Sequence, residues 1–266
     1  MDTPQQQRNC PPLFFGGIVS VSALIKAEDA GTARRRILRV LIEESRFSSE
    51  RRRVAFLRAA SERLGFRVEK ITAGEAEAIS DGPTQTHGGI FAEVTPAVYP
   101  GSRAVVPGKG VFYAVLDGAE DPYSLGHIMR ALYLFGASGL ITGRLPDGAD
   151  AKICRASAGM SELLPVFLCD AEEAVLRLKS GGFRVAAAEI RDSEDAASAD
   201  LSLPLVLICG GEKRGISSKL LSLCDFNVRI PYARDYIGSL PSETAVSVLA
   251  YEIMKQNLPG AVAPSH

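Results

Sequence analysis

Three segments in the second half of the chain place polar residues and glycines directly after an apolar, strand-like run. The first, residues 120–136, contains two carboxylates and, further on, Arg130 within a predicted helix. Arg130 has apolar neighbours in sequence, so its guanidinium either extends to water or lines a site. In an open α/β sheet, sites lie at the carboxyl ends of the strands. The segment therefore predicts one wall of a cleft.

The second segment, residues 203–217, is a buried-strand pattern that runs into a glycine-rich turn. Gly210 and Gly211 allow backbone groups to approach a ligand closely, and Glu212 places a carboxylate inside the turn. The turn matches neither the phosphate-loop pattern nor the G-x-G-x-x-G fingerprint of nicotinamide and flavin sites. It indicates a ligand site of another kind, with an ordinary strand-to-helix turn as the alternative.

The third segment, residues 228–247, reads as a short strand, a loop and the start of a helix. Pro241 suits the first turn of that helix, and Glu243 suits the positive end of its dipole. A strand, a loop and a capped helix explain most of this pattern without any ligand, so its meaning depends on the other two segments.

A sheet must position these segments, and the sequence between them supplies one. Apolar strands are expected at residues 111–116, 139–142, 183–188, 203–209 and 227–230. Helices are expected at residues 125–135, 171–179 and 242–256. This alternation predicts a mostly parallel α/β sheet with helices on both faces.

A smaller α/β domain is expected before this sheet. Its strands are predicted at residues 37–42, 66–71 and 89–94, and its helices at residues 49–64 and 75–80. Several prolines and glycines then interrupt the pattern. We therefore divide the chain into a domain at residues 13–97, a linker at 98–110 and a domain at 111–258.

Composition narrows the possible partners only slightly. The net charge of the whole chain is −1. Residues 1–103 carry 15 Lys and Arg against 12 Asp and Glu, so this part of the chain is the expected place for a polyanion to bind. The five cysteines form no C-x-x-C pair and there are three histidines, so we expect buried thiols and no metal site. With no signal peptide and no apolar stretch near the roughly 20 residues of a membrane span, a cytoplasmic protein that does not enter the membrane is expected.

Taken in order, the three segments resemble the motifs of the SpoU–TrmH family of RNA ribose 2′-O-methyltransferases, within the SPOUT superfamily. Motif one, similar to D-P-x-N-x-G-x-x-x-R-x-A-x-x-F-G, is matched by Asp121, Pro122, Gly126, Arg130, Phe135 and Gly136. Motif two, similar to G-x-E-x-x-G-[IL]-S, is matched by Gly210, Glu212, Gly215, Ile216 and Ser217. Motif three is matched by Ile230, Pro231, Ser239 and Leu240. Ser124 and Pro241 stand where the family usually has Asn.

The resemblance implies several further properties. The second domain is expected to contain a trefoil knot, a rare exception to the usual threading of chains, and to pair with a second copy as a homodimer. S-adenosylmethionine is expected to bind largely to backbone groups of Gly210, Gly211, Ile230 and Leu240. The first domain resembles the RNA-binding domain that many family members share with kink-turn-binding ribosomal proteins, and residues 86–90 resemble its closing segment.

The same resemblance assigns catalytic roles to Arg130, Glu212 and Ser239. A ribose oxygen must attack the sulfonium methyl in line, so alignment of the two atoms supplies much of the rate. Arginine is almost always protonated and therefore a poor base. We expect Arg130 to position the 2′-hydroxyl and stabilise the oxyanion that develops on it. A side chain at Gly210 is expected to block the cofactor without unfolding the protein.

Two other functions are weighed against methylation of ribosomal RNA. Transfer RNA is the alternative substrate of the same reaction, and the extra domain favours the ribosome by family analogy alone. The two missing Asn residues raise the alternative of a catalytically silent protein that binds cofactor and RNA. A nicotinamide dehydrogenase is disfavoured by the absent fingerprint. The basic clusters at residues 34–39 and 51–58 are either solvated or contact RNA phosphates.

Overall fold

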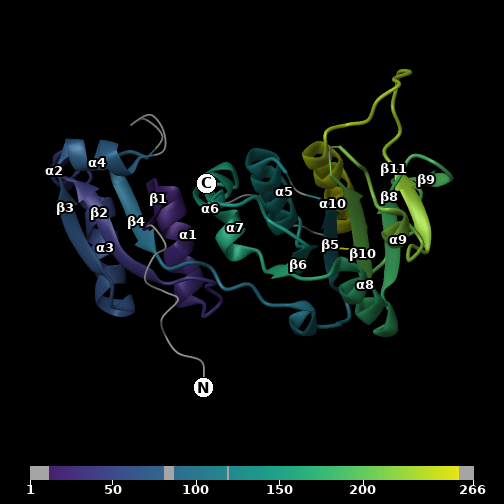
Figure 1. Ribbon diagram of the computed structural model, residues 1–266, viewed down its shortest axis with the longest axis horizontal. Coiled ribbons are helices and arrows are strands. Elements are labelled where there is room, and N and C mark those ends of the chain that lie inside the picture. The colour runs from purple at the N-terminus through teal and green to yellow at the C-terminus, as the bar shows by residue number, and fades with distance from the viewer. Residues whose placement is uncertain (1–11, 81–86, 119, 212, 258–266) are drawn as a thin grey trace. The chain divides into compact units, whose positions relative to one another are not determined.

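The computed structural model describes residues 12–80, 87–118, 120–211 and 213–257, which belong to two compact units, Met1–Val98 and Tyr99–His266 (Figure 1). Each unit has its own sheet and its own buried core. In the described part of the chain, no helix has both the length and the apolar character that a membrane crossing requires.

The first unit is a four-stranded mixed sheet with the strand order β1-β4-β2-β3. Its strands are β1 (Leu13–Gly16), β2 (Ile37–Glu43), β3 (Arg67–Ile71) and β4 (Ile90–Val94). Its helices are α1 (Ile18–Asp29), α2 (Glu44–Ser49), α3 (Arg51–Leu64) and α4 (Ala73–Ile79). The pair β2 and β3 is parallel, and β4 is antiparallel to both β1 and β2.

Local sequence explains where these helices begin and end. Thr72 caps α4 by accepting a hydrogen bond from the backbone N–H of Glu75, whose side chain in turn accepts from the Thr72 N–H. The helix expected at residues 49–64 is α3, which begins at Arg51 because Glu50 leaves the helical conformation. The short helix α2 before it was not predicted. Helix α1 has no counterpart in the sequence prediction, since apolar residues lie on most of its faces and leave no amphipathic period.

The second unit is a seven-stranded parallel sheet with the order β7-β6-β5-β10-β8-β11-β9. Its strands are β5 (Phe112–Asp117), β6 (Gly139–Thr142), β7 (Val166–Leu168), β8 (Arg184–Ala188), β9 (Ser193–Asp195), β10 (Leu205–Gly210) and β11 (Phe226–Arg229). Its α-helices are α5 (Pro122–Leu134), α6 (Asp150–Ala156), α7 (Met160–Leu163), α8 (Ala171–Ser180), α9 (Ser218–Leu221) and α10 (Ser242–Asn257), and a short 3-10 helix covers Ser102–Ala104.

Helices cover both faces of this sheet, and side chains of the central strands alternate between the two cores. In β10, Leu205, Leu207 and Cys209 pack toward α5 and α10, whereas Val206 and Ile208 pack toward α8 and α9. Strand β5 alternates in the same way. This explains the unbroken apolar runs, because a strand buried on both faces has no polar side. The predicted α/β architecture is confirmed, while the knot remains a prediction.

Candidate functional site

The three motif segments all follow the carboxyl ends of strands in the central part of the sheet. Motif one follows β5, motif two follows β10 and motif three follows β11. Because β5 pairs with β10, and β10 and β11 both pair with β8, parallel pairing brings the three loops to one edge of the sheet. The end of β8 also lies at this edge, although no motif in the sequence pointed to it.

The motif-two loop is anchored to the end of β5 by Asp117. The backbone N–H of Gly211 donates to the Asp117 carbonyl at 2.9 Å, and the N–H of Ser217 donates to the Asp117 carboxylate at 2.7 Å. Within the loop, Gly215 N–H donates to the Gly211 carbonyl at 3.2 Å. Asp117 thus holds both ends of a tight loop. Sequence reasoning missed it because a carboxylate at a strand end is common.

Gly210 is required by the loop itself. A Cβ atom at this position would lie 2.2 Å from the backbone carbonyl carbon of Gly215, closer than any real contact. The expectation that a side chain here blocks the cofactor while leaving the fold intact is therefore wrong, since the side chain would first displace the loop. Gly211 is equally confined, because its Cβ would lie 2.4 Å from the Gly118 carbonyl oxygen.

The motif-three loop is closed by a tyrosine and tied to β10 by a serine. Leu240 N–H donates to the Tyr232 hydroxyl at 2.9 Å, so this amide already has a partner. The Ser242 hydroxyl donates to the Gly210 carbonyl at 3.2 Å and joins the start of α10 to motif two. Pro241 precedes α10, and its carbonyl accepts from two backbone N–H groups of the first turn, at 3.0 Å each.

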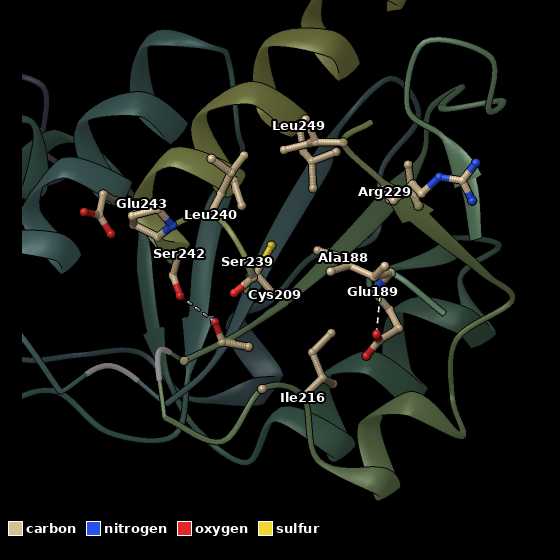
Figure 2. Close-up of a pocket in the computed structure, with 18 of the residues that line it drawn as sticks. Ala188, Glu189, Cys209, Ile216, Arg229, Ser239, Leu240, Ser242, Glu243 and Leu249 are labelled. Atoms are coloured by element: carbon tan, nitrogen blue, oxygen red, sulfur yellow. Dashed lines mark hydrogen bonds between the residues drawn. The ribbon is translucent and has the colours of Figure 1, made fainter. Parts of the chain in front are cut away.

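A cavity of about 650 Å³ lies between these loops (Figure 2). The four predicted cofactor-binding residues all line this cavity, and they are Gly210, Gly211, Ile230 and Leu240. The predicted catalytic residue Ser239 lines it as well. Its wall combines backbone of the glycine loop with apolar side chains of Ile216 and Leu249. The wall also contains four charged residues that were not among the predicted site residues, which are Glu189, Lys213, Arg229 and Glu243.

A second cavity of about 780 Å³ adjoins the first. The two cavities share four lining residues, which are Gly211, Lys213, Gly215 and Ser242. On its other side, the second cavity is lined by the start of α5, including Asp121 and Ser124. The motif-two loop and the start of α10 therefore form the wall between two adjoining cavities.

Charged groups surround the second cavity. Lys213 forms an ion pair with Glu120, and Arg144 forms one with Asp147 at 3.0 Å. The hydrogen bond and charge of Lys213, with the more distant charges of Arg214 and Arg144, lower the pKa of the Glu120 carboxyl. Within the described part of the chain, the Arg214 side chain makes no ion pair. Exposed pairs of this kind contribute little to stability and exchange readily with another anion.

Motif one owes part of its pattern to folding. Asp121 caps α5 by accepting from the backbone N–H of Ser124 at 2.7 Å, and Pro122 occupies the first turn, where no N–H is needed. At Gly126, a Cβ atom would lie 2.5 Å from that of Ala156, so the glycine allows α5 and α6 to pack closely. The matches at Asp121, Pro122 and Gly126 therefore do not by themselves indicate chemistry.

Arg130 lines neither cavity and its side chain is exposed. Ser124, Leu125 and Ile128 of the same helix face the second cavity, and Arg130 lies about 200° around the helix from Ile128. The structure therefore separates Arg130 from the other predicted site residues within this chain.

Glu212 lies outside the described residues. Cys209 lines the first cavity, but burial raises the pKa of its thiol to about 12, so it is not a ready nucleophile. Among the described residues there is no cluster of His, Cys, Asp and Glu side chains that could hold a metal ion.

The basic clusters expected to contact RNA phosphates lie in the first unit. Arg35 is buried against the ring of Phe15, with 4.8 Å between guanidinium carbon and ring centre, and Arg39 pairs with Glu69 and Glu93. Part of the basic cluster at residues 34–39 therefore makes contacts within the fold and is not available to RNA. By contrast, Arg51, Arg52 and Arg58 on α3 are exposed. His87 is buried and accepts from Gly89 N–H at 3.1 Å, which explains residues 87–89 as a structural turn.

The second unit is thus a parallel α/β domain with two adjoining cavities, which are formed by loops at the carboxyl ends of its strands. The profile of the SpoU rRNA Methylase family matches residues 111–251, more than half of the chain. The chain belongs to this family, which is a family of RNA methyltransferases, and the resemblance identified from the motifs is confirmed.

The chain is also similar to known proteins in sequence and to solved structures in fold. A protein assigned to the TrmH family of tRNA/rRNA methyltransferases in Staphylococcus saprophyticus is 28% identical over 196 residues, which cover 71% of this chain and 77% of that protein. The structure of an AdoMet-bound rRNA methyltransferase from Sinorhizobium meliloti has a TM-score of 0.76 and 24% identity, covering 93% of this chain and 88% of that one. A structure described as an RNA 2′-O ribose methyltransferase has a TM-score of 0.73 and 20% identity, covering 95% and 90%.

Proposed function

We propose that this protein transfers a methyl group from S-adenosylmethionine to a ribose 2′-hydroxyl of RNA, with ribosomal RNA as the substrate. The observation that carries the proposal is the pair of adjoining cavities with a shared wall. Group transfer needs a donor site and an acceptor site in contact, so that the reacting atoms can be aligned.

The first cavity fits the cofactor. Its volume of about 650 Å³ lies within the range of roughly 300–1,000 Å³ of small-molecule sites. Gly210, Gly211, Ile230 and Leu240 supply backbone groups and apolar surface for an adenosine, and the two glycines have no side chain that could cover their backbone groups. When bound, S-adenosylmethionine supplies an electrophilic methyl group.

The second cavity is where we place the acceptor nucleotide. It opens beside the shared wall, and Arg144, Lys213 and Arg214 around it can bind the phosphates that flank a target ribose. Their acidic partners Glu120 and Asp147 would be displaced by RNA. Ser242, which lines both cavities, and Ser124 offer hydroxyl groups where the family Asn residues are missing.

We further propose that the protein acts as a homodimer and that Arg130 serves the site of the second copy. Arg130 belongs to an exposed stripe of α5 that also contains Tyr123 and Leu134. Helix α10 packs against α5 and exposes Val248 and Tyr251 beside it, and the rings of Phe135 and Tyr251 lie 5.7 Å apart. An apolar face on two adjacent helices favours association of two copies. A dimer formed through this face would place Arg130 at the site of the partner chain.

In the paired site, Arg130 would position the 2′-hydroxyl and stabilise the developing oxyanion. The guanidinium keeps its charge at all relevant pH values, so it acts as a donor and not as a base. Glu212 and Ser239 stay proposed catalytic residues, and Ser239 lines the donor cavity.

The first unit is proposed to bind structured RNA. Arg51, Arg52 and Arg58 are exposed on one helix, and Phe47 lies under the cationic groups of Arg58 and Lys70, at 5.7 and 4.7 Å from its ring centre. A basic surface of this kind contacts phosphates. The presence of this extra unit supports ribosomal RNA over transfer RNA.

The test is transfer from S-adenosylmethionine labelled in its methyl group to total RNA, followed by digestion to nucleosides. We expect the labelled methyl group in a 2′-O-methylnucleoside that comes chiefly from ribosomal RNA. Label in a methylated base would contradict ribose transfer, and label confined to transfer RNA would contradict the substrate.

A catalytically silent RNA-binding protein is the second candidate, favoured by Ser124 and Pro241. Pro241 has neither a polar side chain nor a backbone N–H, so it cannot replace an Asn. Cofactor and RNA binding without transfer to any cellular RNA would support this candidate.

A further inference from the structure

Glu189 follows β8 directly and lies in the wall of the first cavity (Figure 2). Strand β8 is the parallel neighbour of β10, with Ala187 opposite Ile208, so Glu189 emerges beside Gly210 of the glycine loop. The backbone N–H of Glu189 donates to the Val228 carbonyl at 3.1 Å, which fixes the residue against β11 as well. A carboxylate is thus held at the strand edge where the cavity begins.

The carboxylate is oriented through one of its oxygens. Oε1 accepts from the backbone N–H groups of Ile190 at 2.8 Å and Arg191 at 3.3 Å. Within the described ranges, Glu189 forms no ion pair, whereas Arg229 in the same wall is paired with Asp195 at 2.7 Å. Oε2 therefore remains as an acceptor for a ligand, and its negative charge is not neutralised by a neighbouring cation.

The position of Glu189 in the first cavity indicates which part of the cofactor would contact it, the methyl group or the adenosine. The two cavities join at Gly211, Lys213, Gly215 and Ser242, so the methyl group must lie at that side of the first cavity. Glu189 lines the first cavity alone, and Figure 2 shows it across the cavity from Ser242. The side away from the junction is left for the adenosine, whose ribose carries two hydroxyl donors.

We propose that the Glu189 carboxylate accepts hydrogen bonds from the 2′- and 3′-hydroxyls of the cofactor's ribose and so selects a ribonucleoside cofactor. The inference rests on the proposed assignment of the first cavity to S-adenosylmethionine. The same chemistry is used in dinucleotide-binding folds, where an acidic side chain at the end of an adjacent strand binds the ribose. A charged acceptor makes such hydrogen bonds stronger than neutral ones.

The test measures binding by the full chain with calorimetry, comparing wild type with Glu189→Gln. Three ligands are used: S-adenosylhomocysteine, its 2′,3′-dideoxyribose analogue, and 5′-methylthioadenosine, which keeps the ribose but lacks the amino-acid ammonium group. Glu194→Gln is the matched control, because Glu194 is exposed on β9 and lines neither cavity. Unchanged thermal melting would establish that each variant is folded.

The substitution should raise the Kd of S-adenosylhomocysteine and of 5′-methylthioadenosine by about tenfold each, and leave the Kd of the dideoxy analogue unchanged. Glu194→Gln should change none of the three. An equal loss for the dideoxy analogue would overturn the contact with the ribose. A loss for S-adenosylhomocysteine but not for 5′-methylthioadenosine would assign Glu189 to the ammonium group instead. If wild type bound none of the ligands, the cofactor assignment itself would fail.

Discussion

Single residues of the motifs divide into those that build the loops and those that remain for chemistry. Gly210 belongs to the first group, since a Cβ there would meet the Gly215 backbone at 2.2 Å. Gly210→Ala should therefore lower the free energy of unfolding by about 1–3 kcal/mol through overpacking and weaken cofactor binding at the same time.

Thermal melting and calorimetry of the same variant check this prediction. Gly74→Ala is the control, because Gly74 lies in α4 and nothing within 4 Å would meet its Cβ. Full stability combined with lost cofactor affinity would contradict the structural role of Gly210.

The sequence predicted several residues that line the first cavity, but it did not predict others that lie next to them. Gly210, Ile230 and Leu240 could be named because the order of three motifs is specific, although each motif alone is compatible with an ordinary turn. Asp117 and Glu189 could not be named, since their roles depend on which strands are neighbours and not on spacing along the chain.

At the scale of elements, the loop between β11 and α10 depends on one tyrosine. The hydrogen bond from Leu240 N–H to the Tyr232 hydroxyl closes the loop at 2.9 Å. Tyr232→Phe should raise the Kd of S-adenosylhomocysteine about fivefold, since one hydrogen bond contributes roughly 1 kcal/mol to the order of the loop.

Calorimetry checks this value, with Tyr236→Phe as the control because Tyr236 lies in the same loop and its side chain is largely exposed. Equal affinities of wild type and Tyr232→Phe would show that the closed loop is not needed for binding.

Helix α3 carries the proposed RNA contacts. The double variant Arg51→Ala, Arg52→Ala should weaken RNA binding and reduce the slope of log K against log salt by about 1–2, because each phosphate contact releases counterions. Filter binding at several salt concentrations measures the slope. Lys26→Ala, Arg67→Ala removes the same charge from α1 and β3 of the same unit and should have less effect. Equal effects of the two double variants would place RNA elsewhere.

The strands and helices were predicted best where burial imposes a simple pattern. The central strands β5 and β10 are apolar on both faces and were located within two residues. Short elements such as β9 and α9 have too few residues to show a period, and α1 has no polar face. The knot cannot be inferred from such patterns, because threading leaves no trace in local periodicity.

At the scale of the whole molecule, the proposed dimer makes a complementation prediction. Arg130→Ala lacks the arginine but keeps the donor cavity, whereas Ile230→Arg should fill the cavity and keep the arginine. Each variant alone should be inactive. Mixed in equal amounts and allowed to exchange subunits, they should regain about a quarter of wild-type activity, because about half of the dimers are mixed and each mixed dimer has one complete site of two.

Methyl transfer by the mixture, with light scattering to establish the mass of each variant, checks this prediction. Tyr251→Glu, which places a charge in the exposed face of α10, should yield monomers without activity. A mixture that stays inactive while forming dimers would put Arg130 in the site of its own chain or outside the mechanism.

The proposed 2′-O-methylation of ribosomal RNA can be tested in cells by mapping the 2′-O-methyl groups of all RNA with and without the gene. The expected result is that one ribosomal nucleotide loses its methyl group in the deletion, that the wild-type gene restores it, and that Arg130→Ala does not. An unchanged 2′-O-methyl map in the deletion, or restoration by Arg130→Ala equal to that by wild type, would contradict it.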